Sequence, residues 1–565
     1  MIRPAFEGQT AAGGVRPFAA RLALADWDRL TLLLLCALAG LVLVTFADYG
    51  VTWDEDVHHW YGVLVLDYYL SGLRDLRCLG WLDLYHYGAA FDGLAALLDR
   101  VSPLGTYETR HLFNGLVGVL GIAGAGRLGR ALGGPRAGFL AALLLLATPN
   151  YYGQMFNNPK DIPFAVGMIW AVYYIIRIIP ALPRPKLRLV VKLGAATGLA
   201  LGVRVGGLLL LCYLALVLAA DLLWRLAEER DWRRCLGAVP PILQRVVLPT
   251  LLVAYPVMLV FWPWAQVDPI ANPLRALAAF SHEIFPWTTL FAGRYVPAGE
   301  LPWSYLPTYI ALALPELTLV LLLAAPIVAF PALRGVPPSE RRHWVLRHAL
   351  LAFAILFPVC YAIAVRAVLF DGMRHFIFAL PLIAVVAALA AEHLIKRLRS
   401  RPERRAVYAG LGLYGLAHVA IMAMLHPNEY VYYNGFVGGV EGAQGLFKLD
   451  YWANSYAEDV GALADYLRAT YGRGFATRRF TVAVCGPPIS ADYFFPRNFL
   501  FSPDRQHADF FIAFTKDGCD KSLPGREIYH VERMGAVLSV VLDRRSLLAP
   551  AERDVSALAR RLTFQ

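Results

Sequence analysis

Long blocks of apolar residues alternate with short polar stretches between residues 30 and 425. A helix needs about 20 apolar residues to cross a bilayer, and most blocks approach this length, so we predict about eleven membrane-spanning helices. Two blocks, 137–150 and 189–203, are the shortest. The predicted spans are 30–47, 111–126, 137–150, 162–180, 189–203, 206–224, 246–263, 307–330, 349–367, 375–395 and 406–425.

The composition supports a membrane protein. Hydrophobic residues make up 58% of the chain and charged residues only 17%, too few to cover a soluble protein of this length. The net charge of +11 could indicate a nucleic-acid partner, but the excess Lys and Arg fall mainly in loops on one predicted side. We therefore expect membrane lipids as partners, and no nucleic acid. The first block is interpreted as a retained helix, not a cleaved signal peptide.

The loops between the spans differ in charge from one side of the membrane to the other. Cytoplasmic loops carry the excess of Lys and Arg in membrane proteins. This asymmetry predicts a plasma (inner) membrane protein with a cytoplasmic N-terminus, and an odd number of spans then places 426–565 outside. The basic segments assigned to the inside are 127–130, 184–188, 230–234, 341–342 and 396–405.

The predicted outer segments are unusual in length and content. The loops 48–110 and 264–306 are long and rich in aromatic and charged residues, which is typical of functional loops, although interfacial anchoring explains many single Trp and Tyr residues. The region 426–565 changes character, with a helix expected near 456–471 and strand-like runs at 480–485, 510–514 and 536–542.

The fold class follows from these patterns. We predict a polytopic α-helical membrane domain over 1–425 and a small extracytoplasmic α/β domain over 426–565. Cys485 and Cys519 both lie in the second region, and they can pair there if it is extracytoplasmic.

An acidic cluster follows the first predicted span. Asp54 and Glu55 begin it, and a helix would place them one turn before His58 and His59. Carboxylates at the membrane boundary are costly unless they are solvated, paired or bound to something. Three interpretations stay open: a solvated helix start, a general base or acceptor-binding carboxylate, and a metal site built from carboxylate and imidazole.

Isolated cations mark the outer ends of several spans. Lys160 and Asp161 precede one span, and Lys160 either reaches the headgroup layer or binds a phosphate there. Arg204 lies between two short apolar blocks with glycines beside it, where a phosphate or a buried acid is its natural partner.

Two further polar clusters lie on the same predicted side. Asp371, Arg374 and His375 directly precede one span, and His282 and Glu283 lie in the loop 264–306. Acids in one loop and cations at several helix ends suit transfer of a group from an anionic lipid.

A chemical hypothesis follows for a sugar carried on a polyprenyl phosphate. Phosphate is a good leaving group that needs positive charge, which Lys160, Arg204 and Arg374 could supply. Asp54 is the preferred base for the acceptor hydroxyl and Glu55 the second choice, and one displacement with one base inverts the anomeric centre. Further candidates for substrate binding are His58, Asp161, His282, Glu283, Asp371 and His375.

Short motifs give the chain a family resemblance. The acidic pair at 54–55 resembles the first-loop motif of the glycosyltransferase C (GT-C) superfamily. More narrowly, the chain resembles glycosyltransferase family 39, the protein O-mannosyltransferase and aminoarabinose transferase group, in the motifs at 158–164, 290–295, 302–307 and 371–375.

The resemblance implies a GT-C-like membrane core that moves a sugar, a hexose or a pentose, from a polyprenyl-phosphate donor to an acceptor outside. It implies Asp54 as the catalytic acid group and Lys160 as a ligand of the carrier phosphate. The residues after the acidic pair depart from the eukaryotic pattern, which leaves the acceptor open among glycan, lipid and protein. A divalent metal also stays open, since some relatives bind one. The alternatives are a lipid or solute transporter or flippase, a scaffolding subunit, and an enzyme like an O-antigen ligase.

Overall fold

The structure is a computed structural model and describes residues 18–282 and 287–548. Along the chain, helices come first, with the β1–β2 hairpin between α13 and α14, and a sheet of β3–β7 comes last. The helices are α1 (Phe18–Thr45), α2 (Trp53–Leu70), α3 (Ala90–Asp99), α4 (Thr106–Gly133), α5 (Pro135–Leu146), α6 (Pro149–Asn157), α7 (Asp161–Ile178), α8 (Leu187–Leu201), α9 (Leu208–Glu229), α10 (Trp232–Ile242), α11 (Leu248–Phe261), α12 (Pro263–Val267), α13 (Ala271–His282), α14 (Tyr305–Ala313), α15 (Glu316–Arg334), α16 (Pro338–Ala364), α17 (Leu380–Arg397), α18 (Arg401–Leu425), α19 (Gly439–Ala443), α20 (Tyr456–Tyr471) and α21 (Ile489–Asp492). The strands are β1 (Thr288–Phe291), β2 (Arg294–Pro297), β3 (Phe480–Val484), β4 (Phe499–Phe501), β5 (Phe510–Phe514), β6 (Arg526–Arg533) and β7 (Ala536–Asp543).

All predicted spans are helical over most of their length, but 307–330 is divided at Leu314 and Pro315 into α14 and α15. The multi-pass membrane fold is confirmed. Within the described residues, nine helices are long and apolar enough to cross a membrane, among them a continuous one over Trp232–Phe261 that joins α10 to α11. Helices α5 and α8, which correspond to the two shortest predicted spans, have 12 and 15 residues. Both short helices pack inside the bundle. Helix α5 packs on α4 and α17, and α8 packs on α7 and α11.

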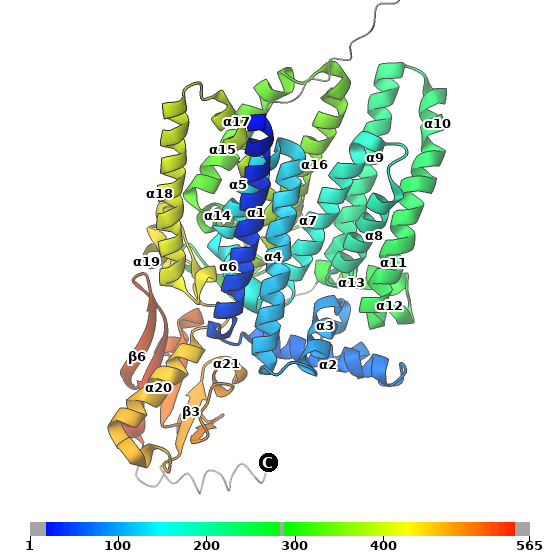
Figure 1. The fold of residues 1–565 in the computed structure, drawn as a ribbon. Coiled ribbons are helices and arrows are strands. Elements are labelled where there is room, and N and C mark those ends of the chain that lie inside the picture. The colour runs from blue at the N-terminus through cyan, green and yellow to red at the C-terminus, as the bar shows by residue number, and fades with distance from the viewer. Residues whose placement is uncertain (1–17, 283–286, 549–565) are drawn as a thin grey trace, which may run out of the picture.

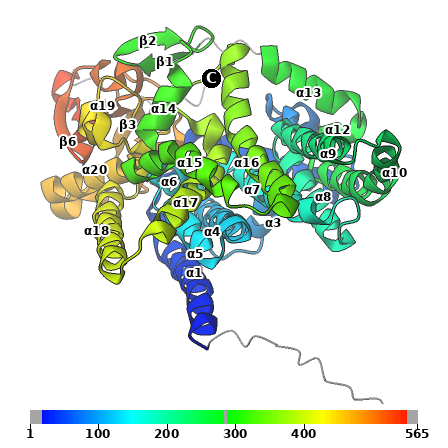
Figure 2. The ribbon, with the colours of Figure 1, turned by 90° about the horizontal axis from the view of Figure 1, so that it is seen from above.

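Burial separates the central helices from the lipid-facing ones. In the most apolar stretch of α17 83% of the residues are buried, compared with 6% in α18 and 11% in α1. Figure 2 shows α18 and α1 at the margin of the bundle, with α17 and α4 further inside. An all-round apolar helix is the expected choice for a central position, since each of its faces meets another helix.

The C-terminal elements form the predicted α/β unit. The helix over 456–471 and the three strand-like runs are confirmed as α20, β3, β5 and β7. The sheet has the order β4-β3-β5-β7-β6, in which β3 runs parallel to β4 and β5, and β7 runs antiparallel to β5 and β6. Its strands β3 and β5 are buried at every position and share one core with α20, which packs on β5, β6 and β7.

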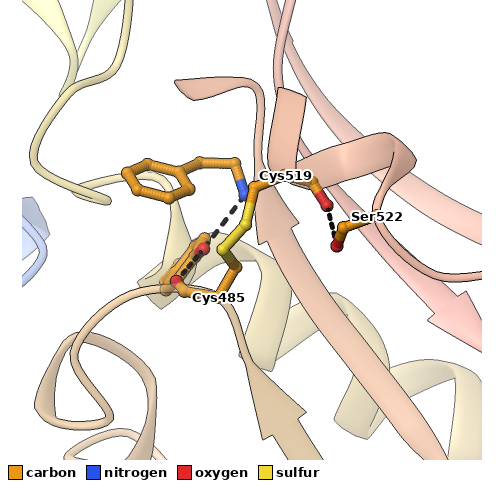
Figure 3. The surroundings of a disulfide bond; sticks show 5 residues. Cys485, Cys519 and Ser522 are labelled. Atoms are coloured by element: carbon orange, nitrogen blue, oxygen red, sulfur yellow. Dashed lines mark hydrogen bonds between the residues drawn. A yellow bond between two sulfur atoms is a disulfide. The ribbon is translucent and has the colours of Figure 1, made fainter. Parts of the chain in front are cut away.

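A disulfide joins two loops of this unit. Cys485, after β3, is bonded to Cys519, after β5, as Figure 3 shows. Nearby, the Tyr456 hydroxyl donates to the Cys485 carbonyl at 2.7 Å and accepts from the Phe514 amide at 3.0 Å. The turn that follows β5 is therefore tied to both β3 and α20.

Several outer elements were not predicted as such. The loop 48–110 contains α2 and α3, and the loop 264–306 contains α12, α13 and the β1–β2 hairpin. Figure 1 shows α2, α3 and the C-terminal sheet at one end of the bundle, opposite the N-terminal end of α1. Residues 430–452 pack in the same core as the membrane helices, together with Val531, Ala536 and Leu538 of β6 and β7. The rest of the sheet shares with α20 a second core that begins at Ala453.

Candidate active site

Helix α2 begins with the acidic cluster, and its cap separates the roles of the two leading acids. Thr52 and Glu55 form a capping box, in which the Glu55 carboxylate accepts from the Thr52 amide at 2.8 Å and from its hydroxyl at 3.1 Å. Its other oxygen lies 2.9 Å from His111 Nε2 on α4. Glu55 is only 1% exposed. Its carboxylate is thus occupied in holding the helix start, and Asp54 is left to face the site.

Asp54 contacts two cations from distant parts of the chain. Its Oδ2 lies 3.1 Å from Arg374 Nη1 and 3.6 Å from Lys160 Nζ. Burial by itself would raise the pKa of the Asp54 carboxyl, but the charges of Lys160 and Arg374 outweigh it and hold that pKa well below its usual range. The two cations therefore favour the ionised form of this carboxylate.

A second ion pair extends this cluster. Arg204 Nη2 lies 2.6 Å from Asp161 Oδ1, and the Asp161 side chain is 3% exposed. The ring of Tyr87 lies beneath both cations, 5.3 Å from Lys160 Nζ and 5.7 Å from the Arg204 guanidinium carbon. Tyr87 can reach them because the backbone at Gly88 packs directly against Gly202, where an added Cβ would lie 2.1 Å from the Gly202 oxygen.

A third group of charges surrounds Asp371. Two lysines that the sequence did not single out, Lys448 and Lys516, place their Nζ atoms 3.6 Å from Asp371 Oδ1, and Arg374 Nη1 lies 3.9 Å from Oδ2. Burial would raise the pKa of Asp371, but Lys516 and Arg374 lower it overall. Burial also lowers the pKa of Lys516. Lys516 comes from the turn that the disulfide holds, so the sheet contributes a charge to the site.

The predicted histidines of α2 do not pair along their own helix. His58 Nδ1 bonds instead to Asp92 on α3 at 2.8 Å, and Asp92 is also held by Arg110 at 3.0 Å. His59 Nδ1 lies 3.5 Å from Asp99, also on α3. Both pairings fix α3 beneath α2, because an imidazole on one helix meets a carboxylate on the other.

The remaining candidates divide into two kinds. His375 packs its ring against Phe370 at a centroid distance of 4.8 Å, next to the Arg374 guanidinium. Glu283 and the side chain of His282 lie outside the described residues. Within the described residues, no group of three or more His, Cys, Asp or Glu side chains is arranged to hold a metal ion.

The charges around Asp54 do not suit a divalent cation. Lys160 and Arg374 already surround the carboxylate that would be its ligand, and they would repel a metal ion placed there. The divalent metal stays an open alternative, as the sequence left it, and we derive no step through it.

Comparison with known proteins adds one family and several solved structures. Residues 109–260 match the family described as dolichyl-phosphate-mannose-protein mannosyltransferase. No curated protein matches the chain. That family segment runs from the start of α4 to the end of α11 and contains Lys160 and Arg204.

Two solved proteins are similar in outline. ArnT from Cupriavidus metallidurans bound to undecaprenyl phosphate is 16% identical, with 90% of this chain and 97% of that chain covered at a TM-score of 0.47. The archaeal oligosaccharyltransferase AglB from Archaeoglobus fulgidus, in complex with an inhibitory peptide and a dolichol-phosphate, is 12% identical, with 86% and 69% covered at 0.47. Both scores are below 0.5, so the site is assigned from the chain's own geometry. The predicted resemblance to the protein O-mannosyltransferase group of the GT-C superfamily is confirmed over residues 109–260.

Proposed function

We propose that the protein is an inverting glycosyltransferase that moves a sugar from a polyprenyl-phosphate carrier to an acceptor on the extracytoplasmic face. The observation that carries this proposal is the convergence of Lys160 and Arg374 on Asp54, a residue of α2. Cations at the ends of membrane-spanning helices suit a lipid phosphate, and a carboxylate among them suits a base. The match over 109–260 supports the same class of reaction.

The proposed reaction is a single displacement at the anomeric carbon. The acceptor hydroxyl gives its proton to Asp54, and its oxygen forms a bond to that carbon. The bond from the carbon to the phosphate oxygen breaks, and the electron pair leaves with the phosphate. Lys160 and Arg374 stabilise the charge on the leaving phosphate, with Arg204 as the third cation of the group. One displacement inverts the configuration.

Donor binding would activate the base by changing its partners. In the empty site Lys160 and Arg374 keep Asp54 ionised and weakly basic. A bound phosphate takes over part of their charge and adds a negative charge of its own, and both effects raise the pKa of Asp54. A carboxylate that becomes more basic when the donor arrives is better matched to proton transfer near neutral pH.

The orientation belongs to the proposal as well. Disulfides persist in oxidising compartments, and Cys485 and Cys519 are bonded. This supports an extracytoplasmic C-terminal unit, and α2, which carries Asp54, lies at the same end of the bundle as the C-terminal sheet. A cysteine introduced at Asp465, whose side chain is 77% exposed, would test it. We expect labelling of this cysteine by a membrane-impermeant maleimide in intact cells, and protection of it would refute the orientation.

The function is tested in liposomes with a panel of labelled polyprenyl-phosphate hexoses and pentoses. Wild type should release free polyprenyl phosphate by transfer or by slow donor hydrolysis. Asp54→Asn and Lys160→Gln should lose this release, while Arg130→Gln, which changes an exposed ion pair with Asp28 at the far end of the bundle, should keep it. Movement of intact donor across the bilayer without any release would overturn the enzyme and favour a flippase.

A further inference from the structure

A cavity of about 400 Å³ lies between the C-terminal sheet, the β1 strand and the start of α2. It adjoins the candidate active site, because Trp53 precedes Asp54 and Asp371 contacts Arg374. The lining residues come from six separate segments of the chain and include both cysteines of the disulfide. They are Trp53, Trp287, Thr288, Phe370, Asp371, Lys448, Cys485, Gly486, Phe514, Lys516, Asp517 and Cys519.

Aromatic rings form the walls of this cavity. Trp53 and Trp287 have their ring centroids 5.9 Å apart and are tilted by 45°, and Phe370 meets Trp287 edge-on at 5.1 Å. Lys516 Nζ lies 4.1 Å above the Trp53 ring. Flat, rigid ring faces provide apolar contact for a ligand that has apolar C–H faces and polar edges.

The charges of the cavity cancel. Its charged lining residues within the described chain are two lysines, Lys448 and Lys516, and two aspartates, Asp371 and Asp517. Lys448 lies 3.6 Å from Asp371 and 3.5 Å from Asp517, so the charges are neutralised in place. A phosphorylated ligand would meet no excess positive charge there, and an acidic peptide would meet none either.

Asp371 is a buried polar group of this cavity whose carboxylate has no hydrogen bond to any described part of the chain. Its side chain is 1% exposed, and neither carboxylate oxygen has a hydrogen-bond partner, because both lysines lie 3.6 Å away. A buried carboxylate without hydrogen bonds is costly. A hydroxyl group placed between Asp371 and the lysines would donate to the carboxylate and accept from an ammonium group.

We propose that this cavity is the acceptor subsite and that it binds a neutral saccharide. Sugar rings would pack on Trp53 and Trp287, and sugar hydroxyls would complete the hydrogen bonds of Asp371 and the lysines. Lys516 acts here as a specificity-determining residue that the C-terminal unit delivers. The assignment of this cavity to the acceptor rests on the proposed function. The saccharide binding that it predicts can be measured without any donor.

The first experiment measures binding of the full-length protein in nanodiscs to a glycan array without donor. The array carries neutral glycans of one to four sugars, the same glycans with a phosphate monoester, and Ser/Thr peptides. We expect binding to members of the neutral set, about tenfold weaker in Trp287→Ala. The matched control is Trp303→Ala, a 73% exposed tryptophan at a neighbouring cavity, and it should bind like wild type.

The second experiment changes the charge of the cavity without changing its shape. Asp517 has a φ of 55°, a conformation that Asn tolerates, so Asp517→Asn removes one negative charge with little strain and leaves the cavity with one net positive charge. Phosphorylated glycans should then bind about fivefold tighter, while Asp520→Asn in the same turn, outside this cavity, should have no such effect.

Three outcomes would overturn the inference: no neutral glycan bound, binding to phosphorylated glycans or peptides alone, and binding that Trp287→Ala leaves unchanged. Donor turnover in liposomes without glycan binding would leave the proposed function standing and remove this subsite. Glycan binding without any donor turnover would do the reverse, because it would keep the saccharide site and remove the transferase.

Discussion

Asp54→Asn separates the two roles that the geometry gives to this residue. The change keeps the size of the side chain and removes both the base and the negative charge between Lys160 and Arg374. Loss of a general base lowers kcat by about 10²–10⁴. The affinity for the donor should increase, because the phosphate no longer competes with a carboxylate for the two cations.

The size of the second effect follows from the contacts. A unit charge 3–4 Å from another gains about 4 kcal/mol at an effective dielectric constant of 20, most of which is offset by desolvation. A net gain of about 1.4 kcal/mol corresponds to tenfold tighter donor binding. Equilibrium binding of a labelled donor in nanodiscs measures the affinity, and single-turnover release of polyprenyl phosphate measures the rate.

Glu55→Gln is the matched control, one residue further along the same helix turn. Glu55 holds the capping box and contacts His111, so Glu55→Gln should lower the free energy of unfolding by about 1–3 kcal/mol. The single-turnover rate should stay within about threefold of wild type, because this side chain does not face the cations. The reasoning is refuted if Glu55→Gln loses turnover while keeping its melting temperature, or if Asp54→Asn binds donor more weakly than wild type.

Three further predictions use the same geometry. The low pKa of Asp54 contributes stability that is fully present above the unfolded value near 3.9 and is lost as pH falls through the folded pKa. For the same reason kcat/KM, which reports the free enzyme, should show no acid limb above about pH 4, while the acid limb of kcat should lie at higher pH. Acid limbs at the same pH would contradict activation of the base by donor binding. Asp161→Asn leaves Arg204 without its partner and should cost about 3–5 kcal/mol in thermal or denaturant unfolding, and an unchanged melting temperature would show that the pair is dispensable. Paired replacement of Cys485 and Cys519 by Ser opens a crosslink with a sequence separation of 34, worth about 4 kcal/mol by chain entropy, and equal resistance to proteolysis with and without the bond would refute that value.

The apolar pattern was sufficient for the helices, and the reason is physical. A lipid-exposed backbone must satisfy its hydrogen bonds within the segment, so a long apolar block has essentially one structure open to it. Even the short blocks at 137–150 and 189–203 are helical. Their lengths could not show that they pack inside the bundle, since that depends on which neighbours surround them.

The candidate site was only partly predictable. The sidedness of the charges placed Asp54, Lys160, Arg204 and Arg374 at one end of the bundle, and the structure brings them into the two ion-pair groups described above. The pairing itself was not predictable, because Arg374 lies 320 residues from its partner.

Two lysines of the site were missed for a related reason. Lys448 and Lys516 lie in the C-terminal region, which was interpreted as a separate unit, and each resembles an ordinary surface lysine in sequence. One signal was present, since Lys516 lies just beyond Thr515 at the end of the buried strand β5 and shortly before a cysteine that pairs. A polar residue at a strand end beside a crosslink is held in place more firmly than a loop residue.

The net charge of the two ion-pair groups around Asp54 and Asp161 predicts which carrier the site accepts. Lys160, Arg204 and Arg374 carry three positive charges, and Asp54 and Asp161 carry two negative ones, which leaves one positive charge. A polyprenyl-phosphate sugar is a phosphodiester with one negative charge, whereas a polyprenyl-diphosphate sugar carries two. The second charge would be buried without compensation, at a cost of several kcal/mol that water and rearrangement reduce in part.

We therefore expect the monophosphate donor to bind about a hundredfold tighter than the diphosphate donor with the same sugar and chain. Competition between the two donors in nanodiscs measures this ratio, and Asp161→Asn, which raises the cluster to two positive charges, should reduce it. Equal affinities in wild type would mean that the cations do not act as one charge-balanced group.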